Sequence, residues 1–517
     1  MSFEEKLKTF RERYRAITVL GGVQGLLGWD QMVNMPHGAM AERGAQLQAL
    51  GGIIYDMGTN PEFGQLIEDL ASEIPDLDAD DPIAREIKLA KRQYDLATKV
   101  PKDKMMEMIM ATTQAQGVWE KAKATNDYAL FQPYLQKILD LSLEFVEYFK
   151  PYDHPYDALS NQFEPGMKSK EVKAIFDALR PRQVELIKAI GERPQPKDDF
   201  LYKRYDIAMQ RKINHLVATL QGYDWSRGRM DESVHPFTTN FGMDDVRITT
   251  KYIENDASGA FFSTMHETGH ALYELGLGRM YQGTSLGSVS SMALHESQSR
   301  LWENLVGRSK AFWNYFYPIY QAYFSEHLAD VNLDDFYKAI NKVSPSLIRT
   351  ESDEATYNLH IMLRFEIELA MLEGKINTKD LPEVWNEKMR DYLGVVPEND
   401  TTGVLQDVHW SGGMIGYFPS YALGNLIASQ WWHKLSQDQP NTLDEIAKGD
   451  LSGVLAWLRE NVHQHGSRYD AMDHRRAPQP GLLYGLPQRK VSGYLWSVSK
   501  FHSFSPNATS FDVAFFI

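Results

Sequence analysis

The chain has 517 residues, 43% of them hydrophobic and 12% aromatic, which is ample for a large packed core. A formal net charge of −15 without any basic run argues against a nucleic-acid partner, and the lack of cysteine excludes disulfides, thiolate zinc sites and cysteine nucleophiles. The N-terminus begins an amphipathic charged helix instead of a signal peptide, and no apolar run approaches the roughly 18–20 residues that span a bilayer. We therefore expect a cytoplasmic protein without a membrane partner.

Apolar residues at helical spacing dominate the first 220 positions. The predicted helical stretches are residues 1–48, 39–70, 83–100, 102–123, 128–149, 169–191 and 203–220. Glycine and proline predict breaks within them at Gly21–Gly22, Met35–Pro36, Gly51–Gly52, Asn60–Pro61 and Pro181. Between helices, residues 75–82 are predicted to form an acidic linker and residues 154–166 a loop.

The character of the sequence changes at Asp231. Residues 235–241 contain a proline that disfavours helix, and residues 246–253 alternate and are β-branched, which predicts a strand. A short sheet at this point could hold an extended peptide along its edge by main-chain hydrogen bonds. Helices are predicted again over residues 291–306, 309–328 (with a kink at Pro318), 333–343, 356–372, 381–392, 419–433 and 443–462.

The segment His266-Glu267-Thr268-Gly269-His270 carries the clearest chemical signal. Residues four apart on a helix share a face, so the imidazoles of His266 and His270 can point at one divalent metal ion. Glu267 can reach a water molecule at that metal without binding the metal itself, which is the position of a general base. The plainer alternative is a chance string on an ordinary helix.

Two histidines leave the metal short of a third protein ligand. A metzincin-type extension would need glycine at position 273 and histidine at position 276, where this chain has Tyr273 and Gly276. The other arrangement takes a glutamate from further along the chain. The candidates are Glu274, Glu296 and Glu303.

Geometry favours Glu296 among these three. Glu274 lies four residues past His270 and would have to bend back toward its own helix. Glu296 lies 26 residues past His270, a gap that fits a turn and an antiparallel return helix. Together with His266 it completes three protein ligands and one open water position, the pattern of catalytic zinc; cobalt or manganese could occupy the same ligands.

The chain resembles the Taq-type thermostable metallocarboxypeptidases, a cytoplasmic zinc family, over about residues 5–473. Five signatures agree in order: His235-Pro236-Phe237, Asp245-x-Arg247-x-Thr249, His266–His270, His295-Glu296-Ser297-Gln298, and Gly403-x-x-Gln406-Asp407-x-His409-Trp410. A sixth, Ile348-Arg349-x-x-Ser352-Asp353, departs only at Ser352, where the family usually has alanine. Gly28-Trp29-Asp30-Gln31 and Met35-Pro36 match the family's N-terminal region as well.

The resemblance implies a mainly α fold with two helical lobes, a deep central groove, a short sheet beside the zinc site, and an architecture similar to neurolysin and angiotensin-converting enzyme. It implies a homodimer and a carboxypeptidase that removes C-terminal residues of peptides one at a time, with broad preference and poorly at proline. Residues 1–473 would form this single catalytic domain. Residues 474–517 do not match the family; between His474 and Phe511 there is no Asp or Glu. This tail is either an irregular docking segment or an end unrelated to the body.

Two tyrosines and two histidines are candidates for stabilising the reacting carbonyl. Tyr417 and Tyr421 follow the flexible glycine-rich stretch 412–416, and resemblance to the helical zinc peptidases favours Tyr417 as the donor to the oxyanion, with Tyr421 on the substrate side. His235 and His409 each stand inside a family signature and could donate to the substrate backbone or to the tetrahedral oxygen.

An exopeptidase must also bind a terminal carboxylate, which a guanidinium does bidentately. Arg349 is the best candidate, and the alternative for it is a salt bridge to Asp353 or Glu351. Arg247 is a weaker candidate, because Asp245 beside it predicts an ion pair that anchors the strand.

Two other functions share much of this sequence pattern. A zinc oligopeptidase or endopeptidase would use the same catalytic residues on internal bonds. A non-catalytic helical scaffold could hold a metal only structurally, although an intact Glu267 argues against it.

Overall fold

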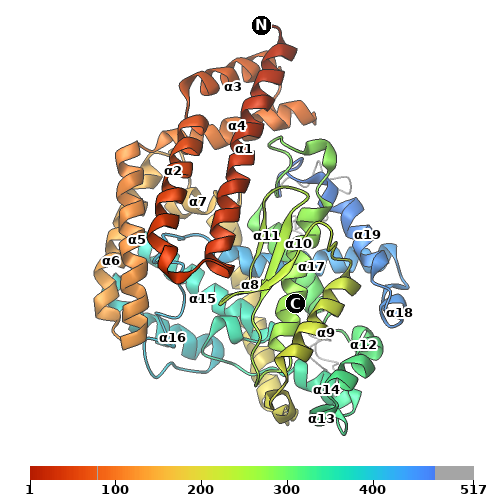
Figure 1. The fold of residues 1–517 in the computed structure, drawn as a ribbon. Helices are drawn as coiled ribbons and strands as arrows, with labels where there is room; N and C mark the ends of the chain where they lie inside the picture. Colours follow the sequence, from red (N-terminus) through yellow and green to blue (C-terminus); the bar gives the residue numbers. More distant parts are fainter. Residues whose placement is uncertain (79, 472–517) are drawn as a thin grey trace.

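Helices make up most of the chain, and the only sheet in the described residues has three short strands, as the sequence predicts. The computed structural model describes residues 1–78 and 80–471 (Figure 1). The predicted tail, residues 474–517, and the predicted domain boundary at residue 473 therefore lie outside the described residues. Within the described part, no helix combines the length and the apolar character that crossing a bilayer requires.

Four helices form an arm at the N-terminus, at the top of Figure 1: α1 (Phe3–Val33), α2 (Met40–Gly58), α3 (Pro61–Glu73) and α4 (Pro82–Lys99). Side-chain caps begin three of them, with Ser2 on α1, Asn60 on α3 and Asp81 on α4. A small separate core that includes Phe10 and Ile67 joins α1, α3 and α4.

The predicted breaks at Gly21–Gly22 and Gly51–Gly52 are wrong, because α1 and α2 run through them. Gly22 serves a close contact instead of a turn: a Cβ there would lie 2.6 Å from the backbone oxygen of Phe241, at the edge of the sheet. Sequence alone does not distinguish a glycine that breaks a helix from one that lets another chain segment approach it.

The next helices are α5 (Lys102–Thr125), α6 (Tyr128–Glu147), α7 (Pro155–Ser160), α8 (Ser169–Gly191) and α9 (Ile207–Gln221). Two predictions fail here. The loop predicted over residues 154–166 contains the short helix α7, which His154 caps, and the break predicted at Pro181 is absent because α8 continues through it. Phe176 and Ile187 on either side of that proline are buried in the main core, and this packing keeps the helix together.

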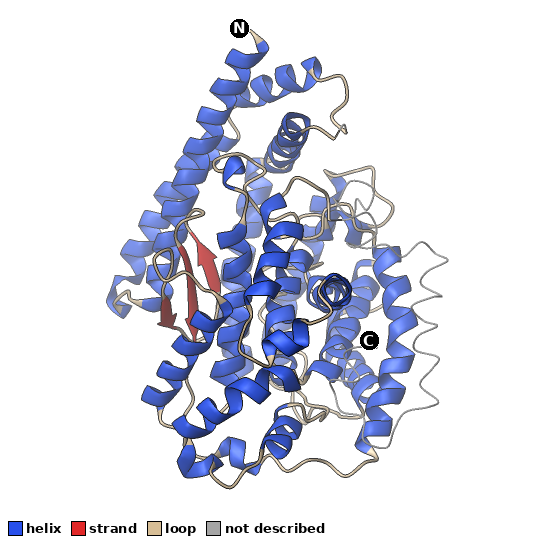
Figure 2. Cartoon of the chain, turned by 90° about the vertical axis from the view of Figure 1, so that its right-hand side faces the viewer, coloured by secondary structure: helices blue, strands red, loops and turns tan. Residues whose placement is uncertain are grey.

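The sheet has the order β1-β3-β2 and lies just before the metal-motif helix in the chain. Strand β3 (Val246–Thr250) pairs in parallel with β1 (Met230–Glu232) and antiparallel with β2 (Thr238–Asn240). It is shorter than the predicted 246–253. Strand β2 lies at one edge of the sheet and contacts the long helix α1. Figure 2 shows this helix beside the three strands.

The second half of the chain is helical again: α10 (Gly259–Gly276), α11 (Met292–Arg300), a π-helical turn (Leu301–Val306), α12 (Lys310–Tyr323), α13 (Ser325–Leu328), α14 (Leu333–Ile340), α15 (Glu354–Leu372), α16 (Leu381–Leu393), α17 (Pro419–Asp438), α18 (Thr442–Ile446) and α19 (Ser452–Asn461). The stretch 309–328 breaks at Phe324 and not at Pro318. The single helix predicted over residues 443–462 is two helices, with Gly449 between them at a φ of 83°.

The main core extends from α5 to α19, and α15 runs through it buried on all sides. Helices α10, α11 and α17 lie together near the centre of Figure 1, with α10 packed against the sheet. Side chains from these central helices and from α15 form the candidate site.

Candidate active site

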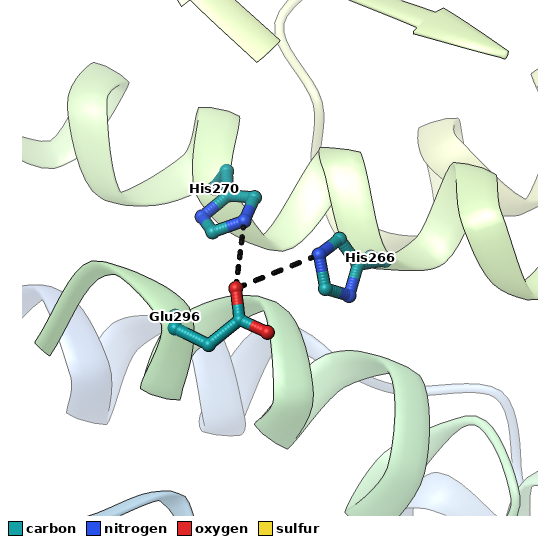
Figure 3. A group of neighbouring side chains, drawn as sticks. All are labelled: His266, His270 and Glu296. Carbon is teal, nitrogen blue, oxygen red and sulfur yellow. Dashed lines mark ion pairs between the residues drawn. The ribbon is translucent and has the colours of Figure 1, made fainter. Parts of the chain in front are cut away.

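Three predicted metal ligands meet between α10 and α11. His266 and His270 project from one face of α10, and Glu296 faces them from α11 (Figure 3). The carboxylate Oε2 of Glu296 lies 3.7 Å from Nε2 of His266 and 3.4 Å from Nε2 of His270. All three ligand atoms fall within 4.8 Å of one another.

This cluster fits a small divalent metal. Ligand atoms at about 2.0–2.1 Å from a tetrahedral zinc stand about 3.3–3.4 Å apart, close to the two separations from Glu296. The Nδ1 atoms of both imidazoles have other partners, so each ring offers its Nε2 toward Glu296. Burial lowers the pKa of His270 to about 3, which keeps that imidazole neutral, as a metal ligand must be.

The two glutamates that competed with Glu296 in the sequence have other positions. Glu303 accepts a hydrogen bond from Nδ1 of His266 at 2.9 Å. Glu274 contacts Nε2 of His295 at 3.0 Å, and Nδ1 of His295 in turn meets Nδ1 of His270 at 2.5 Å. Both glutamates therefore support the imidazoles from behind, and the sequence offered no way to tell this role from direct ligation.

Arg300 balances the charge of the carboxylates and was not foreseen. Its Nε donates to Oε1 of Glu296 at 2.7 Å, and its Nη1 donates to Glu303 at 3.2 Å. Burial raises the pKa of Glu296, but the guanidinium of Arg300 and the imidazoles outweigh burial and hold that pKa well below its usual range. Arg300 stands four residues after Glu296 on the same helix, a spacing that could have signalled the pair.

Two glycines let the ligand helices come this close. A Cβ on Gly269, inside the metal motif, would lie 2.7 Å from the backbone oxygen of Gln298 on α11. A Cβ on Gly424 of α17 would lie 2.6 Å from Cγ of Glu296 itself. Helix α11 is thus held between two helices that approach it at glycine, directly at the ligand.

Glu267 is buried and is held by the sheet. The hydroxyl of Thr238 on β2 lies 2.7 Å from Oε2 of Glu267 and can donate to it. Thr238 is itself fixed by its neighbour, because the backbone N–H of Phe237 donates to the hydroxyl of Thr249 on β3 at 2.9 Å. Two of the signatures, His235–Phe237 and Asp245–Thr249, thereby meet next to the candidate general base.

Arg349 lies buried at the far end of the site, opposite Asp407. Its Nε and Nη2 donate to Oδ1 of Asp407 at 3.0 and 2.9 Å, and its Nη1 donates to the hydroxyl of Tyr357 at 2.8 Å. Asp407 also accepts from Arg364 at 2.7 Å, so one carboxylate faces two guanidinium groups. The salt bridge considered for Arg349 with Asp353 or Glu351 is not formed; the Asp353 side chain caps α15 instead.

Aromatic side chains join this arginine to the metal cluster. The ring of Tyr357 lies 4.3 Å from the guanidinium of Arg300 and carries the hydroxyl that Arg349 contacts. Tyr421 covers Arg349 at 4.8 Å and pairs with His409 at 3.2 Å. Burial lowers the pKa of His409 to about 4, so this imidazole is neutral.

The remaining predicted site residues lie at two places. Tyr417 packs edge-on against Tyr421 with ring centroids 5.1 Å apart, in the same aromatic group. His235 is exposed on the loop between β1 and β2. Arg247 forms the ion pair expected with Asp245 at 2.8 Å and lies over the ring of Trp29 from α1 at 4.4 Å.

Comparison with known proteins decides the family. The family described as carboxypeptidase Taq (M32) metallopeptidase matches residues 9–477. The chain belongs to this family. The predicted resemblance is confirmed, and so is the predicted class of activity, a metallocarboxypeptidase that hydrolyses peptides.

Relatives of this metallocarboxypeptidase match along nearly their whole length. Carboxypeptidase 1 of Bacillus subtilis is 38% identical over 467 residues, which cover 90% of this chain and 93% of the relative. Thermostable carboxypeptidase 1 of Thermus thermophilus is 38% identical over 479 residues, 91% of this chain and 94% of the relative. The solved structure of the M32 carboxypeptidase from Deinococcus radiodurans superposes with a TM-score of 0.89 at 37% identity, covering 96% of this chain and 99% of the other.

Replacing Gly424 with alanine should weaken metal binding. The added methyl group would overlap the side chain of Glu296, which must move away from the two imidazoles. We expect the zinc dissociation constant, measured by competition with a chelator, to rise at least about tenfold. Gly52→Ala in α2, where nothing lies within 4 Å, is the matched control and should leave zinc affinity unchanged. Equal affinities of the two variants would contradict the role of Gly424.

Replacing Thr238 with valine should slow catalysis without loss of metal. Valine keeps the shape but removes the hydroxyl next to Oε2 of Glu267, a contact worth about 1 kcal/mol. We expect kcat to fall about five- to tenfold with bound zinc unchanged. Thr239→Val, on the other face of the same strand, serves as control. A kcat equal to that of the control would show that Thr238 does not orient Glu267.

Proposed function

We propose that this metallocarboxypeptidase releases single residues from the C-terminus of peptides by zinc-dependent hydrolysis, with Arg349 binding the terminal carboxylate. The observation that supports this best is the buried group around Asp407, where two guanidinium groups face one carboxylate. An uncompensated positive charge in a buried position is costly and attracts an anion. Three of the five N–H groups of Arg349 have partners among the described residues, which leaves two for a ligand.

His266, His270 and Glu296 would hold the metal. Two imidazoles and a carboxylate suit zinc, and cobalt or manganese are possible substitutes at the same ligands. When bound, the metal supplies the Lewis acidity that brings the pKa of a water molecule to about 7 and polarises the scissile carbonyl. Arg300 and Glu303 keep the charge of the cluster balanced around that position.

Glu267 would act as the general base. It takes a proton from the attacking water and then passes it to the leaving amine. Burial raises the pKa of Glu267, which increases its affinity for the proton that it must carry. Thr238 holds one of its two carboxylate oxygens, so the other remains for the proton.

The oxyanion that develops on the scissile carbonyl needs a hydrogen-bond donor from the protein. Tyr417 is our first candidate, and burial raises its pKa, so its hydroxyl keeps the proton that it donates. Tyr421 would contact the substrate beside Arg349, with His409 as its partner. His235 and Arg247 lie toward the sheet and would act on the substrate backbone further from the terminus.

The proposals for the overall architecture, the oligomeric state and the specificity rest on the resemblance to the family. We propose one catalytic domain of two helical lobes with a deep groove between them, as in neurolysin and angiotensin-converting enzyme, and a cytoplasmic homodimer. Preference for the terminal residue would be broad and weak for proline. An oligopeptidase with the same residues is the alternative, and its substrates would not need a free carboxylate.

Digestion of a matched peptide pair separates these activities. We expect residues to be released one at a time from a peptide with a free C-terminus, and the same peptide with a C-terminal amide to lose at least about a hundredfold in kcat/KM, because Arg349 then lacks its anion. Glu267→Gln should abolish both reactions while zinc stays bound. Cleavage of internal bonds at equal rate in the amidated peptide, followed by mass spectrometry, would identify an oligopeptidase instead.

Arg349→Met tests the carboxylate site directly. The remaining pair of Arg364 and Asp407 is neutral, so the fold should tolerate the change. We expect kcat/KM on N-blocked dipeptides to fall about a hundredfold, mostly through KM, with zinc content unchanged. Arg11→Met is the control, because Arg11 pairs with Glu86 in the N-terminal arm and lies outside the proposed site. A smaller loss in Arg349→Met than in the control would exclude Arg349 as the anchor.

A further inference from the structure

The two candidate histidine ligands have different supports. Nδ1 of His266 meets the carboxylate of Glu303 directly at 2.9 Å. Nδ1 of His270 meets a second imidazole, that of His295, at 2.5 Å, with the rings 4.4 Å apart and inclined by 30°. The contact therefore depends on which nitrogen of His295 carries the proton, because each ring nitrogen can either donate or accept a hydrogen bond.

Counting protons leaves one arrangement. If His270 is neutral and its Nε2 lone pair is free for the proposed metal, the proton of this ring must be on Nδ1. That N–H can donate to Nδ1 of His295 only if this nitrogen is bare. The proton of His295 then lies on Nε2, where it donates to Oε1 of Glu274 at 3.0 Å.

Glu274 is held at its other oxygen too. The side-chain amide of Asn240, on the edge strand β2, donates to Oε2 of Glu274 at 2.5 Å. The ring of Tyr273 packs against His295 with centroids 5.6 Å apart. Three residues of α10, His270, Tyr273 and Glu274, therefore contact His295, and both nitrogens of its ring have partners.

We propose that His295 is a positioning residue for the metal: it links His270 to the carboxylate of Glu274, and this relay of His270, His295 and Glu274 sets the orientation and basicity of one ligand. The inference rests on the proposed metal site. Glu274 keeps His295 in the tautomer that accepts from His270. The opposite tautomer would set two N–H groups against each other and push His270 away from the metal.

Two variants cut the relay at different places. Glu274→Gln keeps the size of the side chain, but its amide can donate to His295 and so favours the wrong tautomer. His295→Asn keeps an acceptor near Nδ1 of His270 and removes the connection to Glu274. The readouts are the zinc dissociation constant, from chelator competition, and the melting temperature of the metal-free protein.

We expect Glu274→Gln to weaken zinc binding about 10- to 100-fold in the otherwise unaltered chain, the usual effect of an outer partner. In the His295→Asn background the same substitution should change affinity less than about threefold, because the relay is already cut. Glu303→Gln acts on the other imidazole, so its effect should multiply with that of Glu274→Gln. Comparing Glu274→Gln with and without His295→Asn distinguishes a relay from general damage to the metal site.

Three results would overturn the relay. One is unchanged zinc affinity in Glu274→Gln; another is an equal loss with and without His295. The third is that the variants lower the melting temperature of the metal-free protein and change nothing else. That result would indicate that these residues contribute only to packing. If the unaltered chain binds no zinc, the proposed function fails together with the relay. If it binds zinc and the variants bind equally well, the relay alone fails.

Discussion

The close approach of three helices underlies everything else in this structure. Helix α11 lies against α10 at Gly269 and against α17 at Gly424, and in both places a single methyl group would overlap its atoms. Only at this distance can Glu296 reach the two imidazoles of α10. The metal motif alone provides two candidate ligands on one helix face, and the third candidate depends on how tightly the neighbouring helix packs.

The electrostatics of the site follow from that packing. Bringing three glutamates and two imidazoles into a buried space requires compensating charge, which Arg300 supplies between Glu296 and Glu303. Tyr357 then joins Arg300 to Arg349, where the balance is reversed and positive charge is in excess. The negative cluster suits a metal cation and the positive one suits a carboxylate, and we propose that the substrate binds with its scissile bond at the first and its terminus at the second.

The edge strand β2 contributes on the opposite side of α10. Alternation places Thr238 and Asn240 on the same face, where they contact Glu267 and Glu274, one helical repeat of seven residues apart. Helix α1 supports this strand from outside, where Gly22 admits the backbone of Phe241. A three-residue strand thus contacts both the candidate base and the glutamate of the proposed relay.

The sequence by itself determined the chemistry that depends on local spacing. It predicted that Glu296 comes together with the two histidines of the motif, and it predicted the strand before the motif, the family and most of the helices. Tertiary structure decided the rest: that α1, α2 and α8 continue through glycine or proline, that Glu274 and Glu303 contact the imidazoles of His295 and His266, and that Arg349 pairs with Asp407 instead of Asp353. The physical reason is the range of the interactions. Helical periodicity and metal-ligand spacing act over a few residues and are visible in the sequence, whereas packing at a glycine and the pairing of buried charges join residues that are far apart in the chain.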